Sequence, residues 1–118
     1  MRLRFLLATV VAVLTASLSA QQVYDFGADG VSSPTTIMKV PASYSAQARA
    51  AGVEGYVVMR AVVTATGTIR DVMVTQSLEP SLDAAAVVAL QQWAFKPGRK
   101  DGQPVAVRMT FTTRFTLR

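Results

Sequence analysis

Two residue types are absent from this chain of 118 residues: cysteine and histidine. Without cysteine there is no disulfide framework, no thiolate zinc site and no cysteine nucleophile. Without histidine the chain lacks the commonest general base and the commonest metal ligand. The sequence also lacks a glycine-rich phosphate loop. We therefore expect no enzymatic activity, no metal and no cofactor.

The N-terminal residues have the order of a removable export signal. A basic start at residues 1–4 is followed by an apolar run from Phe5 to Leu18, and a polar stretch opens at Gln21. The run is shorter than the ~20 residues that a spanning helix needs. We predict a signal peptide over residues 1–20, with an uncleaved membrane anchor as the alternative.

The charge balance is only mildly basic once the signal is set aside. The chain has 12 Lys and Arg against 7 Asp and Glu, and removal of Arg2 and Arg4 would leave ten against seven. That excess gives little support for nucleic-acid binding, which an export signal also disfavours. We expect no nucleic-acid partner.

The first half of the remaining chain predicts an arm and a short helix. Residues 21–36 are rich in Asp, Gly and Ser without periodicity, so we interpret them as a linker or flexible arm, with ordered structure starting near Ile37. Ser45 to Ala51 predicts a helix with Ser45 as its N-cap, and Gly52 suits the left-handed position after its end.

A hairpin is predicted next. Apolar residues alternate from Val57 to Val63, Thr66-Gly67 forms the turn, and a return strand runs from Ile69 to about Thr75. Because Val72 and Val74 are out of phase with Ile69, we expect a β-bulge near Arg70-Asp71.

A second helix is predicted after Pro80, with Ser81 as its cap and Asp83 beside the positive end of the helix dipole. Pro97-Gly98 ends it, and residues 98–102 form a solvated loop. An apolar stripe at helical spacing defines its buried face: Leu82, Ala85, Ala86, Ala89, Leu90 and Trp93.

The last strand gives the clearest pattern. Six of the seven odd positions from Val105 to Leu117 are apolar, whereas the even positions are mostly Arg and Thr. The predicted fold over residues 37–118 is α+β: a three-stranded antiparallel sheet with two helices packed on one face, in the order helix-strand-strand-helix-strand. The right-handed crossover rule lets the last strand pair beside the first, at a sheet edge.

Several motifs together resemble the TonB C-terminal domain family. They are Leu82-Asp83-x-Ala85-Ala86, Trp93-x-Phe95-x-Pro97 and Gly102-x-Pro104-Val105, preceded by Gly55 and Gly67 in the hairpin. The resemblance implies a stand-alone periplasmic domain that engages an extended peptide of an outer-membrane receptor or other envelope protein. TonB-type transducers also carry a functional histidine in an anchor, and this chain has no histidine.

In this family the peptide is added as an extra strand beside the last strand, as part of TonB-dependent transport. Carried onto this sequence, the peptide-binding residues are Arg108, Thr110, Thr112, Arg114 and Thr116. This expectation requires the outer flank of the strand to be free, and occupation of the flank by the chain from Gln21 onward would rule it out. The membrane would be contacted only through an uncleaved N-terminal segment.

Other interpretations of the same residues stay open. The arginines and threonines also suit an edge strand that is merely protected from aggregation. The same edge could pair with a second copy, giving a structural or assembly module that homodimerises. Trp93 and Phe95 are interpreted as core rather than as a ligand groove. Asp83 is interpreted as a partner of the helix dipole rather than an acid–base group.

Overall fold

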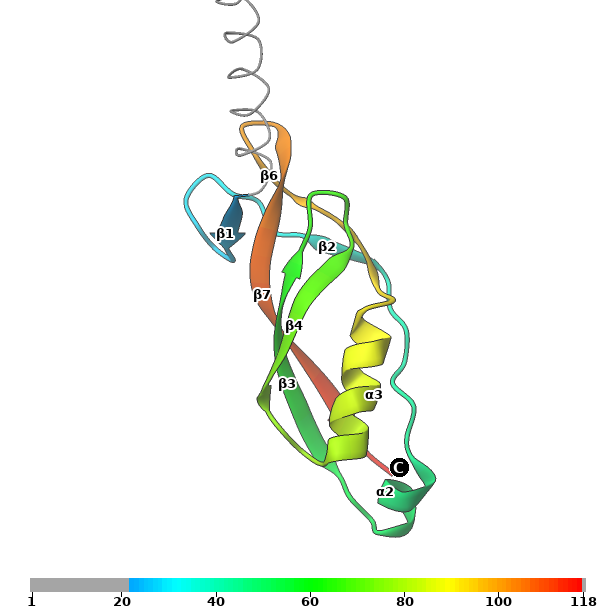
Figure 1. The fold of residues 1–118 in the computed structure, drawn as a ribbon. Coiled ribbons are helices and arrows are strands. Elements are labelled where there is room, and N and C mark those ends of the chain that lie inside the picture. The colour runs from blue at the N-terminus through cyan, green and yellow to red at the C-terminus, as the bar shows by residue number, and fades with distance from the viewer. Residues whose placement is uncertain (1–21, 118) are drawn as a thin grey trace, which may run out of the picture.

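The computed structural model of the chain describes residues 22–117, which form an α+β fold (Figure 1). The predicted signal peptide lies outside these residues. The helices are α2 (Ala46–Ala50) and α3 (Pro80–Leu90). The strands are β1 (Val23–Asp25), β2 (Thr35–Met38), β3 (Gly55–Val63), β4 (Ile69–Gln76), β5 (Ala94–Lys96), β6 (Gly98–Lys100) and β7 (Gln103–Phe115). Within residues 22–117 no helix is long and apolar enough to cross a membrane.

The three long strands lie as the sequence predicts, but the sheet is larger. β3 pairs antiparallel with β4 on one side and with β7 on the other, so the last long strand lies beside the first. β1 then joins β7 in parallel, β6 pairs with the start of β7, and β2 and β5 form a separate two-stranded sheet. The expectation of a purely antiparallel sheet of three strands is therefore wrong, because three or four residues are too few to show a period-two pattern.

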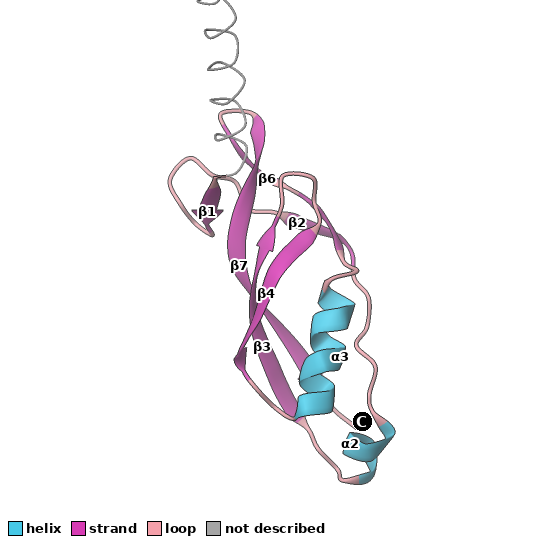
Figure 2. Ribbon diagram, in the orientation of Figure 1, coloured by secondary structure: helices cyan, strands magenta, loops and turns pink. Residues whose placement is uncertain are grey.

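One apolar core joins the sheet to both helices. Figure 2 shows α3 alongside β3 and β4. The predicted alternation is confirmed: Val107, Phe111 and Phe115 of β7 are buried, and the even positions from 108 to 114 are exposed. The rest of the core cluster comes from β3, β5 and the helices: Ala48, Val57, Met59, Ala61, Val63, Leu82, Ala86, Leu90 and Phe95.

The short helix α2 has the predicted cap. The Ser45 hydroxyl accepts a hydrogen bond from the amide of Ala48 at 3.1 Å, and Gly52 adopts a φ of +69° after the helix end. The cap pairs one of the first amides of this five-residue helix, and the Gly52 amide donates to the Arg49 carbonyl at its end.

The β3–β4 hairpin also matches expectation, including its bulge. Val62 pairs with Arg70 and Arg60 with Met73, so two residues of β4 lie opposite one residue of β3. Asp71 within the bulge has a φ of +55°. The bulge brings Val72 and Val74 of β4 against the core.

Helix α3 differs from its prediction at both ends. Its N-cap is Glu79, whose carboxylate accepts from the amides of Ser81 and Leu82, so Ser81 lies inside the helix. The helix ends at Leu90 instead of continuing through Trp93, and the chain then forms β5. The predicted solvated loop at 98–102 is also wrong: β6 and a tight turn at Asp101-Gly102, with φ of +52° and +77°, lead into β7.

The segment over residues 21–36 is not simply a linker, and ordered structure does not begin near Ile37. β1 pairs Val23 with Ala106 and Asp25 with Arg108, and the amide of Ser32 donates to the carbonyl of Arg99 at 2.8 Å. These contacts are backbone hydrogen bonds, which depend weakly on side-chain pattern and so leave no periodic signal in the sequence.

Candidate functional site

The outer edge of β7 is divided into a paired part and an unpaired part. β1 pairs with residues 106–108, so the expectation that the whole flank is free is wrong. From Met109 to Phe115, β3 is the strand that pairs with β7 within residues 22–117, and it lies on the inner side. The arm therefore occupies only the beginning of this edge.

The hydrogen-bonding groups on the unpaired part can be assigned from two contacts. The Arg108 carbonyl accepts from the Phe26 amide at 3.0 Å, so Arg108 directs its backbone groups outward to β1. The Val58 carbonyl, opposite Thr112, accepts from the Thr75 hydroxyl at 3.3 Å on the far side of β3. Because backbone direction alternates along a strand, Thr110, Thr112 and Arg114 direct their N–H and C=O groups to the unpaired edge.

The five residues predicted for peptide binding lie at or near this edge, and all are exposed. Arg108, Thr110, Thr112 and Arg114 belong to β7, with side chains on the sheet face opposite the helices. Thr116 follows the strand, and its hydroxyl donates to the Glu54 carboxylate at 3.3 Å. The sequence pattern thus placed the set on one strand, although β1 already pairs beside Arg108.

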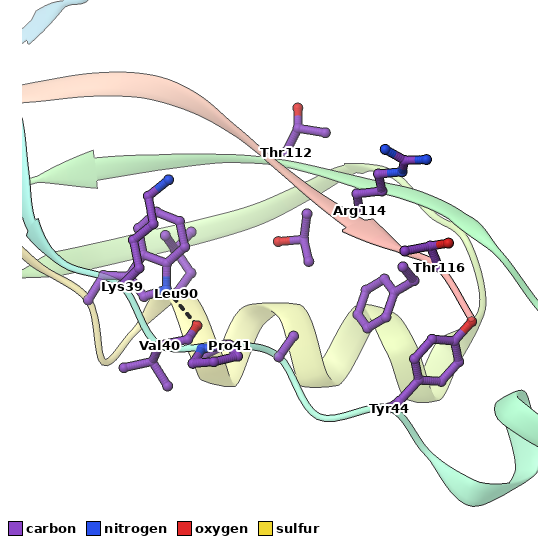
Figure 3. Close-up of a pocket in the computed structure, with 13 residues that line it drawn as sticks. Lys39, Val40, Pro41, Tyr44, Leu90, Thr112, Arg114 and Thr116 are labelled. Carbon is purple, nitrogen blue, oxygen red and sulfur yellow. Dashed lines mark hydrogen bonds between the residues drawn. The ribbon is translucent and has the colours of Figure 1, made fainter. Parts of the chain in front are cut away.

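A groove follows the unpaired edge and was not predicted from the sequence. A cavity of about 530 Å³ is lined on one side by Thr112–Thr116 and on the other by Lys39–Ala42 and Tyr44. Its floor comes from Ala89, Leu90 and Trp93 at the end of α3 and just after it. Figure 3 shows Thr112 and Arg114 on β7, with their side chains directed away from the extended segment that carries Val40 and Pro41 across the groove.

Two aromatic side chains hold the second wall of the groove in place. The indole N–H of Trp93 donates to the Val40 carbonyl at 2.9 Å, the dashed contact in Figure 3. The Tyr44 ring meets the Phe115 ring edge-on at 5.5 Å, and its hydroxyl donates to the Val53 carbonyl. Trp93 is therefore both part of the core and the anchor of the groove wall.

The groove and the edge carry unpaired positive charge. Lys39 and Arg114 line the groove, and no acidic residue does. Lys39 lies 5.5 Å from the centre of the Trp93 ring, a cation–π distance. Along residues 22–117 one ion pair forms, Arg70 with Asp71, and it lies away from this groove.

The carboxylate of Asp83 has a structural role in the loop before α3. Asp83 accepts from the Ser77 hydroxyl and the Leu78 amide and so closes the β4–α3 loop. Desolvation raises the pKa of Asp83, but these hydrogen bonds outweigh it and hold the pKa below its ordinary value. In the described part of the chain, no cluster of three or more His, Cys, Asp or Glu residues could hold a metal ion.

The residues of the family motifs lie in the core or at close backbone contacts. Leu82 and Ala86 are fully buried, and Phe95 is 4% exposed. Gly55 and Gly67 lie where a side chain would clash, against Leu78 and the carbonyl of Phe95 respectively. Pro97 lies half-buried between β5 and β6. These residues support the groove without lining it, except for Trp93.

The comparisons with known proteins agree with this arrangement. The family model described as Gram-negative bacterial TonB protein C-terminal matches residues 40–117. The chain belongs to the TonB C-terminal family. The match covers both helices, every long strand and both walls of the groove from Val40 onward.

Two relatives of this family extend the comparison. Protein TonB of Vibrio cholerae serotype O1 is 35% identical over 97 residues, which cover 75% of this chain and 40% of that protein. The chain thus spans less than half of its curated relative. The solution NMR structure of the Pseudomonas aeruginosa TonB CTD matches with a TM-score of 0.63 at 25% identity, covering 80% of this chain and 93% of that one.

Proposed function

We propose that this TonB C-terminal domain binds an extended peptide of an outer-membrane receptor or another envelope protein by strand addition, as part of TonB-dependent transport in the periplasm. The guest strand pairs with β7 between Met109 and Phe115. The observation that carries the proposal is the unpaired outer edge of this segment, which borders a groove wide enough for side chains. The proposed function is binding, without catalysis.

The chemistry of the edge suits a peptide backbone. Thr110, Thr112 and Arg114 each offer one N–H and one C=O, so a guest strand can form up to six backbone hydrogen bonds. Side chains of an added strand alternate between two faces. One set would enter the groove over Leu90 and Trp93, and the other would lie on the exposed sheet face. Backbone bonds would then supply affinity and the groove selectivity.

Thr112→Pro tests the edge directly. The backbone N–H of Thr112 points outward, away from β3. Proline at this position removes a donor to the guest strand and leaves the β3–β7 ladder intact, because edge strands tolerate proline. We expect receptor N-terminal peptides to bind the variant about tenfold or more weakly, because one hydrogen bond and close approach are lost. Thr112→Val is the matched control, since it keeps the N–H and changes only the hydroxyl.

The measurement is isothermal titration of each variant with the same peptides, after urea unfolding has shown that both remain folded. Unchanged peptide affinity in Thr112→Pro would refute strand addition at this edge. A loss of equal size in Thr112→Val would instead assign binding to the side chain.

Pairing of the same edge with a second copy is the competing use of this site. Two β7 strands could pair across a two-fold axis over the unpaired segment. Light scattering across a dilution series separates the two: a monomer at all concentrations excludes the homodimer, whereas a dimer that peptide dissociates shows both partners sharing one edge.

A further inference from the structure

A second cavity lies at the point where β1 leaves the edge of β7. It has a volume of about 340 Å³ and is lined by Asp25, Phe26, Arg60, Arg108, Met109 and Thr110. Directly after β1, the Phe26 amide donates a hydrogen bond to the Arg108 carbonyl of β7. A guest strand on the unpaired edge would therefore start or end at this cavity.

The cavity places two arginines around a small residue. Arg60 pairs in register with Thr110, and Arg108 lies two positions earlier on β7. The two arginines are diagonal neighbours on one face, with Cβ atoms about 7–8 Å apart by strand geometry. Thr110 lies between Arg60 and the unpaired edge, and its side chain is too short to separate the Arg60 guanidinium group from a guest strand on that edge.

Among the residues that the structure describes, neither arginine has an acidic partner within ion-pair distance. Arg70 with Asp71 is the ion pair found along residues 22–117, and it involves neither of them. Asp25 is opposite Arg108 in register and lines the same cavity, yet it makes no ion pair. Two positive charges against one negative charge leave the cavity with an excess that a carboxylate would neutralise.

We propose that Arg60 and Arg108 form a carboxylate subsite that selects guest peptides with an acidic side chain at the β1 end of the added strand. This inference rests on the proposed function, because the guest strand brings the carboxylate to the cavity. Guanidinium groups suit this role, since each can donate two parallel hydrogen bonds to a carboxylate. Asp25 competes with the guest carboxylate and tunes the selectivity of the subsite.

The test uses synthetic heptapeptides of alternating threonine and valine, blocked at both termini. One pair carries glutamate or glutamine at the N-terminus and a second pair at the C-terminus, which covers both strand directions. Isothermal titration gives the glutamate-to-glutamine affinity ratio for the protein and its variants. We expect one pair to favour glutamate by about two- to fivefold, which is the range of an exposed ion pair.

Four variants assign that preference. Arg60→Gln and Arg108→Gln are each expected to reduce the glutamate-to-glutamine affinity ratio toward one. Asp25→Asn is expected to increase it, because the competing carboxylate is lost. Lys96→Gln is the matched control: it removes one positive charge from β5, outside the cavity, and should keep the ratio.

The outcomes separate the two proposals. Equal affinities of the glutamate and glutamine peptides would overturn the subsite and leave strand addition standing. The same holds if the preference for glutamate survives the Arg60→Gln, Arg108→Gln double variant. If no heptapeptide binds at all, strand addition fails and the subsite fails with it.

Discussion

Gly67 allows a direct test of how the β3–β4 turn meets β5. It is buried, has a φ of +83°, and its carbonyl accepts from the Phe95 amide at 3.0 Å. A Cβ added at this position would lie 2.0 Å from the Phe95 carbonyl oxygen, which is backbone and cannot rotate away. Gly67→Ala must therefore push the turn and β5 apart.

The expected cost has three parts. A left-handed backbone costs an alanine about 1–2 kcal/mol relative to glycine. Loss of the hydrogen bond between Phe95 and Gly67 adds about 1 kcal/mol. Displacement of Phe95, which packs against Trp93 and Phe111 at ring distances of 6.1 and 5.7 Å, adds a further loss of core packing. We expect the free energy of unfolding to fall by about 3 kcal/mol or more, a large share of the usual 5–15 kcal/mol.

Gly52→Ala is the matched control, since Gly52 has a φ of +69° and nothing within 4 Å of an added Cβ. It should cost only the backbone contribution, about 1–2 kcal/mol. Urea unfolding followed by the fluorescence of Trp93, the one tryptophan of the chain, measures both variants. Equal losses in the two variants would refute the close contact between the turn and β5.

Two further predictions concern the core and the loop before α3. Met59→Ala should lower the free energy of unfolding by about 2–5 kcal/mol because Met59 is fully buried, whereas Met73→Ala, at a 65% exposed position, should change it by less than about 0.5 kcal/mol in the same urea assay. Hydrogen bonds from Ser81 to Glu79, and from Ser77 and Leu78 to Asp83, lower the pKa of both carboxyls from ordinary values of 4.5 and 3.8. Stability from such depressed pKa values is present at neutral pH and is lost as the pH falls below about 4.5. Urea midpoints at pH 7, 5, 4 and 3 should therefore decline at the acid end, and they should decline less steeply in Asp83→Asn. An unchanged slope in that variant would contradict this assignment.

The long elements could be predicted because their two faces differ. Alternation over 13 residues predicts β7, and the out-of-phase Val72 predicts the bulge. The cap of α2 followed from Ser45, which belongs to the residue types that accept best from the first amides of a helix. In each case local chemistry and tertiary packing favour the same structure.

The start of α3 shows where local preference misleads. Ser81 is a better cap by residue type, but Pro80 fits the first helical position, where its missing N–H costs nothing. The residue before Pro80 must then act as the cap, and the Glu79 carboxylate is long enough to reach the amides of Ser81 and Leu82. The position of Pro80 therefore sets the start of α3. The preference of proline for the first helical position is the sequence signal that predicts this start.

The groove depends on the other end of α3, where a tertiary contact overrides a helical pattern. The apolar stripe continues to Trp93, yet the helix ends at Leu90 and the chain becomes β5, which pairs with β2. That pairing directs the chain after Met38 alongside α3 toward α2 (Figure 1). The indole N–H of Trp93 then fixes Val40 opposite the edge of β7.

The edge and its facing wall therefore have different origins. The alternating sequence predicts the exposed face of β7. The unpaired segment of the β7 edge begins where β1 ends, at the Phe26–Arg108 hydrogen bond. The wall exists only because residues 53 positions apart, Val40 and Trp93, meet in the folded chain. A single strand edge without such a wall would offer backbone bonds to any extended chain. The wall adds side-chain contacts on one face of the guest, and so gives selectivity to an interaction that the edge alone would leave unselective.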